Sequence, residues 1–150
     1  MQPGQQPQQQ NQYRNENHRI VQARNWVVTL WDEELMRAPG PLNEAGLPRG
    51  MNFMVGQREM GGNSTEEHWQ LYVEFDSRMT VTQIRRLTGW DRVFMEPRYG
   101  PQDKAIEYVK KEETRVEGTQ FEYGEKHAPD AAGSWSSATQ AIKEGATFED

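Results

Sequence analysis

An alternating run of eight residues, 68–75 (HWQLYVEF), constrains the fold more than any other part of the chain. Every second position holds a large apolar side chain: Trp69, Leu71, Val73 and Phe75. The positions between them are His68, Gln70, Tyr72 and Glu74. Because successive side chains of a strand point to opposite sides of its sheet, this pattern predicts a strand with one face against a core. We expect the opposite face to be free and to carry the functional site.

Further strands are expected on both sides of this one. Residues 26–31, 52–59, 91–96 and 121–123 are rich in β-branched, aromatic or other apolar residues and lie between turn-forming segments. Two helices are expected between them: a capping box at Thr80 and Gln83 begins the first, which would bury Leu87. The second is expected over 101–112, with Ala105, Ile106 and Val109 facing inward. This order predicts an α+β fold, a central antiparallel sheet of about five strands with helices packed on one face.

The composition divides the chain into three parts. Residues 1–24 are rich in Gln, Asn and Pro, which predicts a disordered tail, and residues 126–150 form an acidic, Ala/Gly/Ser-rich linker or tail. The folded domain is expected over 25–125. The chain has no cysteine, no apolar run near the roughly 20 residues of a membrane helix, and no signal-peptide pattern at its start. These features predict an intracellular protein that does not enter a membrane.

His68 and Gln70 lie two residues apart, so both project from the polar face of the same strand. Glu59 ends the preceding strand and would lie near them if the two strands form a hairpin. A carboxylate, an imidazole and an amide oxygen suit a divalent ion of octahedral preference, Mg²⁺ or Mn²⁺, better than zinc. Glu66 and Glu67 are rival carboxylates. A pair of exposed polar residues with no ligand is the alternative reading of His68 and Gln70.

Tyr108 and Lys111 are spaced to share one face of the second helix, where a lysine could favour the phenolate of a nucleophilic tyrosine. An ordinary surface pair is the alternative interpretation. Charge supports a nucleic-acid partner: the whole chain carries −6, but residues 78–111 hold eight basic and four acidic residues, a net +4. Lys104 lies one turn before Tyr108 and adds to that charge.

Three motifs together resemble the HUH-type endonuclease domain of the replication-initiator (Rep) proteins of circular single-stranded DNA viruses, of the circovirus and nanovirus kind. The first motif is matched by residues 28–31 (VTLW), where Trp31 replaces the family's usual Asn. The second is matched by 55–59 (VGQRE) and 67–75, which contain the H-x-Q pair. The third, Y-x-x-K, is matched by 108–111, with Val109 where Cys is common. The motifs occur in the family's order within residues 24–125.

The resemblance implies that Glu59, His68 and Gln70 hold Mg²⁺ or Mn²⁺ and that Tyr108 attacks a phosphodiester, assisted by Lys111. The product would be a 5′-phosphotyrosine that is later reversed to rejoin the strand. The implied partner is single-stranded DNA at a hairpin-borne viral origin, and the implied location is the host nucleus. No P-loop motif occurs in the sequence, so a helicase domain, where one exists, would lie beyond this chain. Oligomer formation is left open.

DNA would contact the basic segment. The expected nucleic-acid-binding residues are Arg85, Arg86, Arg98, Lys104 and Lys110, with Tyr72 as a base-stacking ring. Two other functions remain open at this point. The run 68–75 also resembles the RNA-binding strand of an RRM, which would make the chain a non-catalytic binder of single-stranded nucleic acid. A hydrolytic nuclease would use the same three metal ligands with water as its nucleophile.

Overall fold

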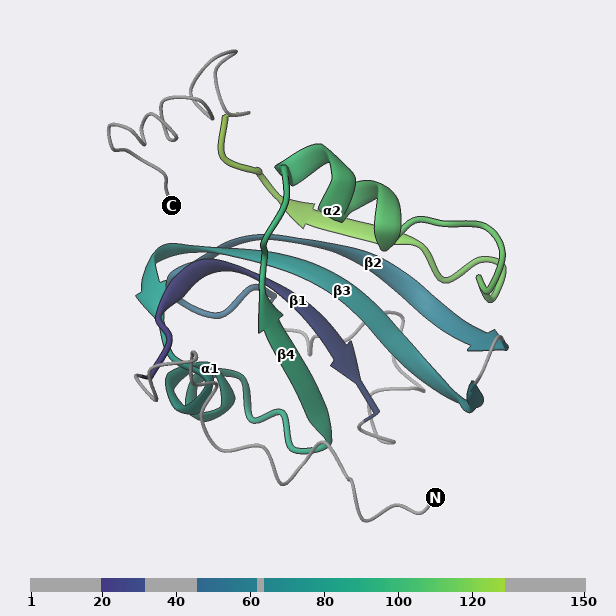
Figure 1. Ribbon diagram of the computed structural model, residues 1–150, viewed down its shortest axis with the longest axis horizontal. Helices are drawn as coiled ribbons and strands as arrows, with labels where there is room; N and C mark the ends of the chain where they lie inside the picture. The colour runs from purple at the N-terminus through teal and green to yellow at the C-terminus, as the bar shows by residue number, and fades with distance from the viewer. Residues whose placement is uncertain (1–19, 32–45, 62–63, 129–150) are drawn as a thin grey trace.

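The computed structural model describes residues 20–31, 46–61 and 64–128, which form one antiparallel sheet and two helices (Figure 1). The strands are β1 (Ala23–Leu30), β2 (Met51–Gly61), β3 (Ser64–Met79), β4 (Val93–Pro97) and β5 (Phe121–Gly124). The helices are α1 (Val81–Thr88) and α2 (Gln102–Tyr108). The order across the sheet is β4-β1-β3-β2-β5, and all neighbours are antiparallel. The predicted α+β fold with a five-stranded sheet is confirmed.

The strand that dominates the sequence also dominates the sheet. β3 has 16 residues, twice the predicted length, and pairs with β1 along one edge and β2 along the other. β1 begins at Ala23, inside the segment expected to be a tail. Most of the two predicted tails, residues 1–19 and 129–150, lies outside the described residues.

The main core lies between the sheet and α1. The predicted apolar face of β3 is confirmed, because Trp69 and the three apolar residues that alternate with it are fully buried. Burial of each such side chain contributes roughly 1.5–3 kcal/mol. Thr80 and Gln83 form the predicted capping box, which satisfies two backbone N–H groups at the start of α1. Leu87 is 36% exposed, so its predicted burial is wrong: the eight-residue helix buries Val81 and Ile84 before the chain turns away.

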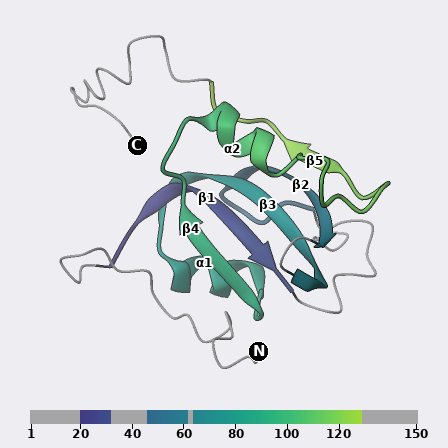
Figure 2. The same ribbon diagram turned by 45° about the vertical axis from the view of Figure 1, so that its right-hand side comes forward.

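A second, smaller core lies on the other face of the sheet, beneath α2. It contains Phe53 and Val55 of β2, Tyr72 of β3, and Ala105 and Val109 at α2. The expectation that both helices pack on one face and leave the other free is therefore wrong, and the two helices lie on opposite sides of the sheet (Figure 2). The inward orientation predicted for the apolar residues of the second helix is correct.

α2 is shorter than the sequence predicted and ends at Tyr108, one turn before residue 112. The carbonyl oxygen of Lys111 accepts a hydrogen bond from Gln57 Nε2 at 2.6 Å, a contact with the sheet that takes the place of a continued helical bond. Neither α1 nor α2 is long and apolar enough to cross a membrane, and the described residues contain no other helix.

Candidate active site

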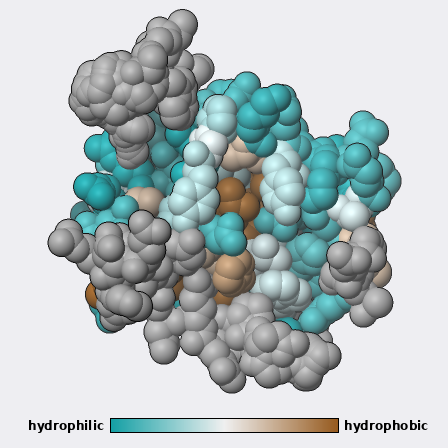
Figure 3. Space-filling model, in the orientation of Figure 1, coloured by the Kyte–Doolittle hydropathy of each residue, from teal (hydrophilic) through white to brown (hydrophobic). Residues whose placement is uncertain are grey.

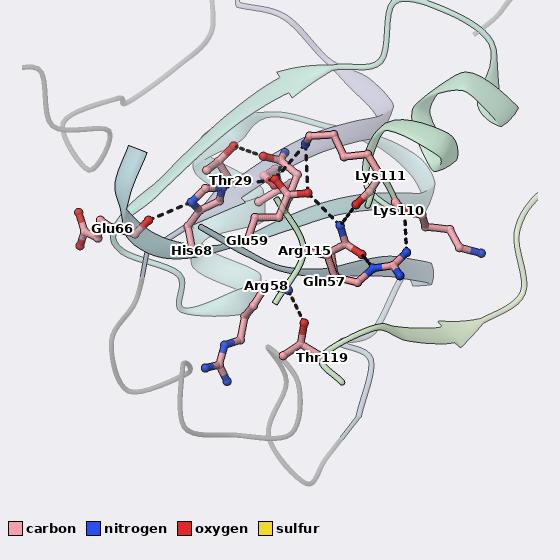
Figure 4. Close-up of polar contacts among 12 residues, drawn as sticks. Thr29, Gln57, Arg58, Glu59, Glu66, His68, Lys110, Lys111, Arg115 and Thr119 are labelled. Atoms are coloured by element: carbon pink, nitrogen blue, oxygen red, sulfur yellow. Dashed lines mark hydrogen bonds and ion pairs between the residues drawn. The ribbon is translucent and has the colours of Figure 1, made fainter. Parts of the chain in front are cut away.

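The register of the three central strands brings polar side chains together. Across β2 and β3, Glu59 pairs with His68 and Gln57 pairs with Gln70. On the other edge of β3, Thr29 of β1 also pairs with Gln70. Directly paired residues project from the same face, so these five residues form one polar cluster on the face that α2 covers (Figure 4). The hairpin that was needed to bring Glu59 to His68 is present.

Glu59 is the negative centre of the polar cluster. It is only 3% exposed, and its two oxygens accept hydrogen bonds from Lys111 Nζ at 2.9 and 3.1 Å. Gln57 Nε2 donates to it at 3.1 Å, and His68 Nε2 lies 3.8 Å from Oε1. Burial by itself would raise the pKa of Glu59, but the hydrogen bonds from these neighbours outweigh it and hold the pKa at about 2. The carboxylate is therefore ionised at neutral pH and attracts a cation.

His68 and Gln70 are oriented by backbone carbonyls. His68 Nδ1 lies 3.3 Å from the carbonyl oxygen of Glu66, and its Nε2 points toward Glu59. A metal ion at Glu59 would bind Nε2 in the tautomer that carries its proton on Nδ1, which then donates to that carbonyl. Gln70 Nε2 donates to the Val28 carbonyl at 3.1 Å, and Gln70 Oε1 accepts from the Thr29 hydroxyl at 3.3 Å. Each side chain thus presents an acceptor atom, as a metal ligand must.

The donor types of Glu59, His68 and Gln70 fit a hard divalent cation. Within residues 20–31, 46–61 and 64–128, no group of three His, Cys, Asp and Glu side chains forms, so a third protein ligand would have to be the Gln70 amide. The rival carboxylates pair with arginines, Glu66 with Arg92 at 3.0 Å and Glu67 with Arg58.

Lys111 connects the polar cluster to Tyr108. Its Nζ lies 2.9 Å from Glu59 Oε1 and 4.3 Å from the centroid of the Tyr108 ring. A cation over an aromatic ring is attracted by roughly 0.5–2 kcal/mol, so the ammonium also holds the ring beside the cluster. The two side chains do not share a helix face as predicted, because Lys111 belongs to the turn after α2, but the structure still brings them together.

Tyr108 lines a pocket of about 390 Å³ between α2, the end of β4 and the sheet. The polar cluster reaches this pocket through Thr29 and Gln70, and two cations, Arg98 and Lys104, border it. Tyr108 is 51% exposed, so its ring is accessible from solvent. Figure 3 shows hydrophobic surface at the centre of one face of the molecule, framed by hydrophilic groups. The volume of the pocket that Tyr108 lines falls within the range of small-molecule binding sites.

The basic residues expected to contact nucleic acid are divided between two faces. Arg98 and Lys104 line the pocket, and Lys110 is exposed just beyond α2. Arg85 and Arg86 belong to α1, on the opposite side of the sheet, so the structure does not bring them to the site.

Tyr72 cannot stack on a base as expected, because it is fully buried beneath α2. Its hydroxyl donates to Glu74 Oε2 and accepts a bond from Arg98 Nη1 at 2.9 Å, and burial raises its pKa. The alternation correctly placed Tyr72 on the polar face but could not show that a helix covers it. An RRM-like binder would need exposed aromatic rings there, and Gln70, Tyr72 and Glu74 are all buried instead.

Gln57 and Arg115 are site residues that the sequence prediction missed. Gln57 is fully buried; its Nε2 donates to Glu59 and to the Lys111 carbonyl, and its Oε1 accepts from Arg115 Nε at 2.9 Å. Gln57 lies two residues before Glu59 in the same strand, so period-two spacing could have identified it. Arg115 lies in a connection, where no periodicity points to it.

The five-stranded antiparallel sheet and the polar cluster beside a tyrosine and a lysine are the features that the motif resemblance to viral replication proteins predicts. Comparison with known proteins agrees: residues 23–112 match the model of the Viral_Rep family of viral replication proteins. The chain belongs to this family, and the resemblance read from its motifs is confirmed.

The similar proteins include three master replication proteins. That of subterranean clover stunt virus is 39% identical over 85 residues, that of milk vetch dwarf virus 36% and that of faba bean necrotic yellows virus 35%, each over 85 residues. The matched region covers 57% of this chain and 28% of each relative, so this chain corresponds to a small part of those proteins.

Proposed function

We propose that this domain nicks and rejoins single-stranded DNA at a viral replication origin, with Tyr108 as its nucleophile. The observation that carries the proposal is the position of the Lys111 ammonium, 4.3 Å from the centre of the tyrosine ring and 2.9 Å from the ionised Glu59. One side chain thereby joins a solvent-accessible phenol to a carboxylate that attracts cations. Membership of a replication-protein family supports the same proposal.

In the proposed reaction, Tyr108 Oη attacks the phosphorus of a phosphodiester, and the bond from phosphorus to the 3′ oxygen breaks. The phenol loses a proton and the departing 3′ oxygen gains one, so the products are a 5′-phosphotyrosine and a free 3′-OH. Lys111 stabilises the phenolate that forms and the charge on the phosphate oxygens. Attack by a 3′-OH on the phosphotyrosine reverses these steps and rejoins the strand, because the covalent intermediate retains the bond.

Glu59, His68 and Gln70 would hold a divalent cation, Mg²⁺ or Mn²⁺. Bound there, the cation would supply Lewis-acid polarisation of the phosphate. Gln57 and Thr29 orient two of these ligands by hydrogen bonds, Gln57 at Glu59 and Thr29 at Gln70.

Single-stranded DNA would lie along the pocket that Tyr108 borders. Arg98 and Lys104 line that pocket and would contact its phosphates. The expected DNA is a hairpin-borne origin, which would place the protein in the host nucleus.

A doubly labelled hairpin whose single-stranded loop is randomised tests this function without knowledge of the origin sequence. The hairpin is incubated with the protein and Mn²⁺, and the mixture is denatured and resolved by electrophoresis. A label at the 3′ end should move with the protein, because the fragment that begins with the 5′ phosphate stays on Tyr108. A label at the 5′ end should appear in a free strand that a polymerase can extend.

Two tyrosine variants complete the test. Tyr108→Phe should form no adduct, whereas Tyr99→Phe should still form one, although Tyr99 is 69% exposed and lines the same pocket. Cleavage without an adduct in Tyr108→Phe would indicate a hydrolytic nuclease. Binding without cleavage in the wild-type protein would indicate a nucleic-acid-binding module.

A further inference from the structure

Lys111 occupies the position that a metal ion would need on Glu59. Both oxygens of the carboxylate accept hydrogen bonds from its ammonium, at 2.9 and 3.1 Å. We infer that Lys111 is a built-in counter-ion, which a divalent cation displaces from Glu59, and that this displacement frees the ammonium for Tyr108 and the phosphate. This inference rests on the proposed metal-dependent nuclease function and adds an order of events to it.

A counter-ion is required because Glu59 is buried. The carboxylate is 3% exposed, and a buried charge without a partner costs several kcal/mol. Gln57 Nε2 donates to one oxygen but carries no net charge. The Lys111 ammonium, which contacts both carboxylate oxygens, is therefore the nearest positive charge to Glu59.

Metal and ammonium exclude each other at this carboxylate. A divalent cation would take at least one oxygen that Lys111 now contacts, and cations about 4 Å apart repel strongly in a site shielded from water. A divalent cation would gain His68 and Gln70 as further ligands, whereas the ammonium contacts Glu59 and the Tyr108 ring. The polar cluster can thus favour a divalent cation over the lysine.

Lys111 is able to leave Glu59 without a change of the backbone. Its side chain is 29% exposed, whereas that of Glu59 is 4% exposed. Its carbonyl oxygen stays bonded to Gln57 at 2.6 Å, which fixes the main chain, while four rotatable bonds let the ammonium move. The Tyr108 ring, already 4.3 Å away, gives the displaced ammonium a second partner.

The consequence is that the lysine has two states. Without metal it is bound to Glu59 and unavailable to a phosphate. With metal it stays beside Tyr108, where its charge can act on the phenol and on the DNA. Metal binding would therefore precede productive binding of the scissile phosphate.

Mn²⁺ affinity, measured from the electron paramagnetic resonance signal of the free ion, tests this inference on the full chain in the absence of DNA. Lys111→Met keeps the aliphatic length and removes the charge, so its affinity should rise at least about tenfold over the wild type. Lys111→Arg keeps a competing cation and should show no such rise. Lys110→Met removes the same charge from an exposed neighbour whose side chain points away from Glu59 (Figure 4), and should change affinity by less than about threefold.

Two further measurements protect the test against misfolding and indirect effects. Near-ultraviolet circular dichroism should be unchanged in Lys111→Met, and Mn²⁺ should raise its melting temperature more than that of the wild type. In the wild type, the ¹⁵N signal of the Lys111 ammonium, assigned by its loss in Lys111→Met, should shift when diamagnetic Mg²⁺ is added.

The outcomes separate this inference from the proposed nuclease. Equal or weaker Mn²⁺ binding by Lys111→Met, with normal binding by the wild type, overturns the counter-ion role and leaves the nuclease standing. An equal rise in the Mn²⁺ affinity of Lys110→Met also overturns the counter-ion role, because the loss of any nearby positive charge would then have the same effect. Absence of Mn²⁺ binding in every variant overturns both the inference and the metal-dependent part of the proposed function, whereas the covalent adduct tests Tyr108 separately.

Discussion

The ion pair at Glu59 should make the stability of the domain depend on pH in a defined way. The pKa of Glu59 is lowered from 4.5 to about 2 in the folded protein. A depressed carboxylate pKa stabilises the folded state above the unfolded value and loses that effect as pH falls through the folded value. The difference corresponds to about 3 kcal/mol at pH 7, of which about 2 kcal/mol should be lost by pH 3.

Urea unfolding of the wild type and Glu59→Gln from pH 7 to pH 3 measures this contribution. Glutamine has nearly the same shape but cannot ionise, so the difference in free energy of unfolding between the two proteins should shrink by about 2 kcal/mol across that range. Glu66→Gln is the matched control: Glu66 pairs with Arg92 but its side chain is 54% exposed, so its loss should cost less than about 1 kcal/mol. A difference between wild type and Glu59→Gln that stays constant with pH would refute the reasoning.

Four other substitutions give direct tests. Tyr72→Phe removes a buried hydroxyl bonded to a carboxylate and should lower the free energy of unfolding by about 1–3 kcal/mol in urea titrations. Gly56→Ala would place a methyl group 2.2 Å from the Gln70 carbonyl oxygen, so it should destabilise the domain by more than about 2 kcal/mol. Faster amide hydrogen exchange in β2 and β3 would report the disturbed register of the two strands. Arg86→Ala should leave single-stranded DNA affinity at low salt nearly unchanged, whereas Lys104→Ala should weaken it severalfold in fluorescence anisotropy.

The sheet could be predicted from the sequence because the patterns that specify its strands lie within short stretches of the chain. Alternation in β3 specified which side chains face the main core, and the capping box specified where α1 begins. The position of α2 could not be predicted in this way. Tyr72 belongs to the polar set of β3 by alternation, yet it is buried because Ala105 and Val109 approach that face from thirty or more residues away. A period-two pattern identifies the two faces of a strand but not the number of layers around it.

Part of the site could be predicted for the same local reasons. Glu59 faces His68 because a hairpin joins their strands, and the sequence shows the Gly-rich turn between them. The contact of Lys111 with Glu59 was not predicted, since helical spacing assigned Lys111 to a helix that ends at Tyr108. Side chains in turns and connections have no periodicity, so their partners follow only from the tertiary structure.

Two buried carboxylates on one face of the sheet hold the segment that carries Tyr108. Glu74 is fully buried and accepts a bond from Nε2 of Gln102, the first residue of α2, at 2.8 Å. Glu59 holds Lys111, three residues after the helix ends. A seven-residue helix has little stability of its own, so these contacts at its two ends and its apolar face determine where it lies. A cation that replaced the Lys111 ammonium at Glu59 would leave both ends of the helix in place, because the Lys111 carbonyl stays bonded to Gln57 and Gln102 stays bonded to Glu74. Any movement would therefore be confined to the lysine side chain beside Tyr108.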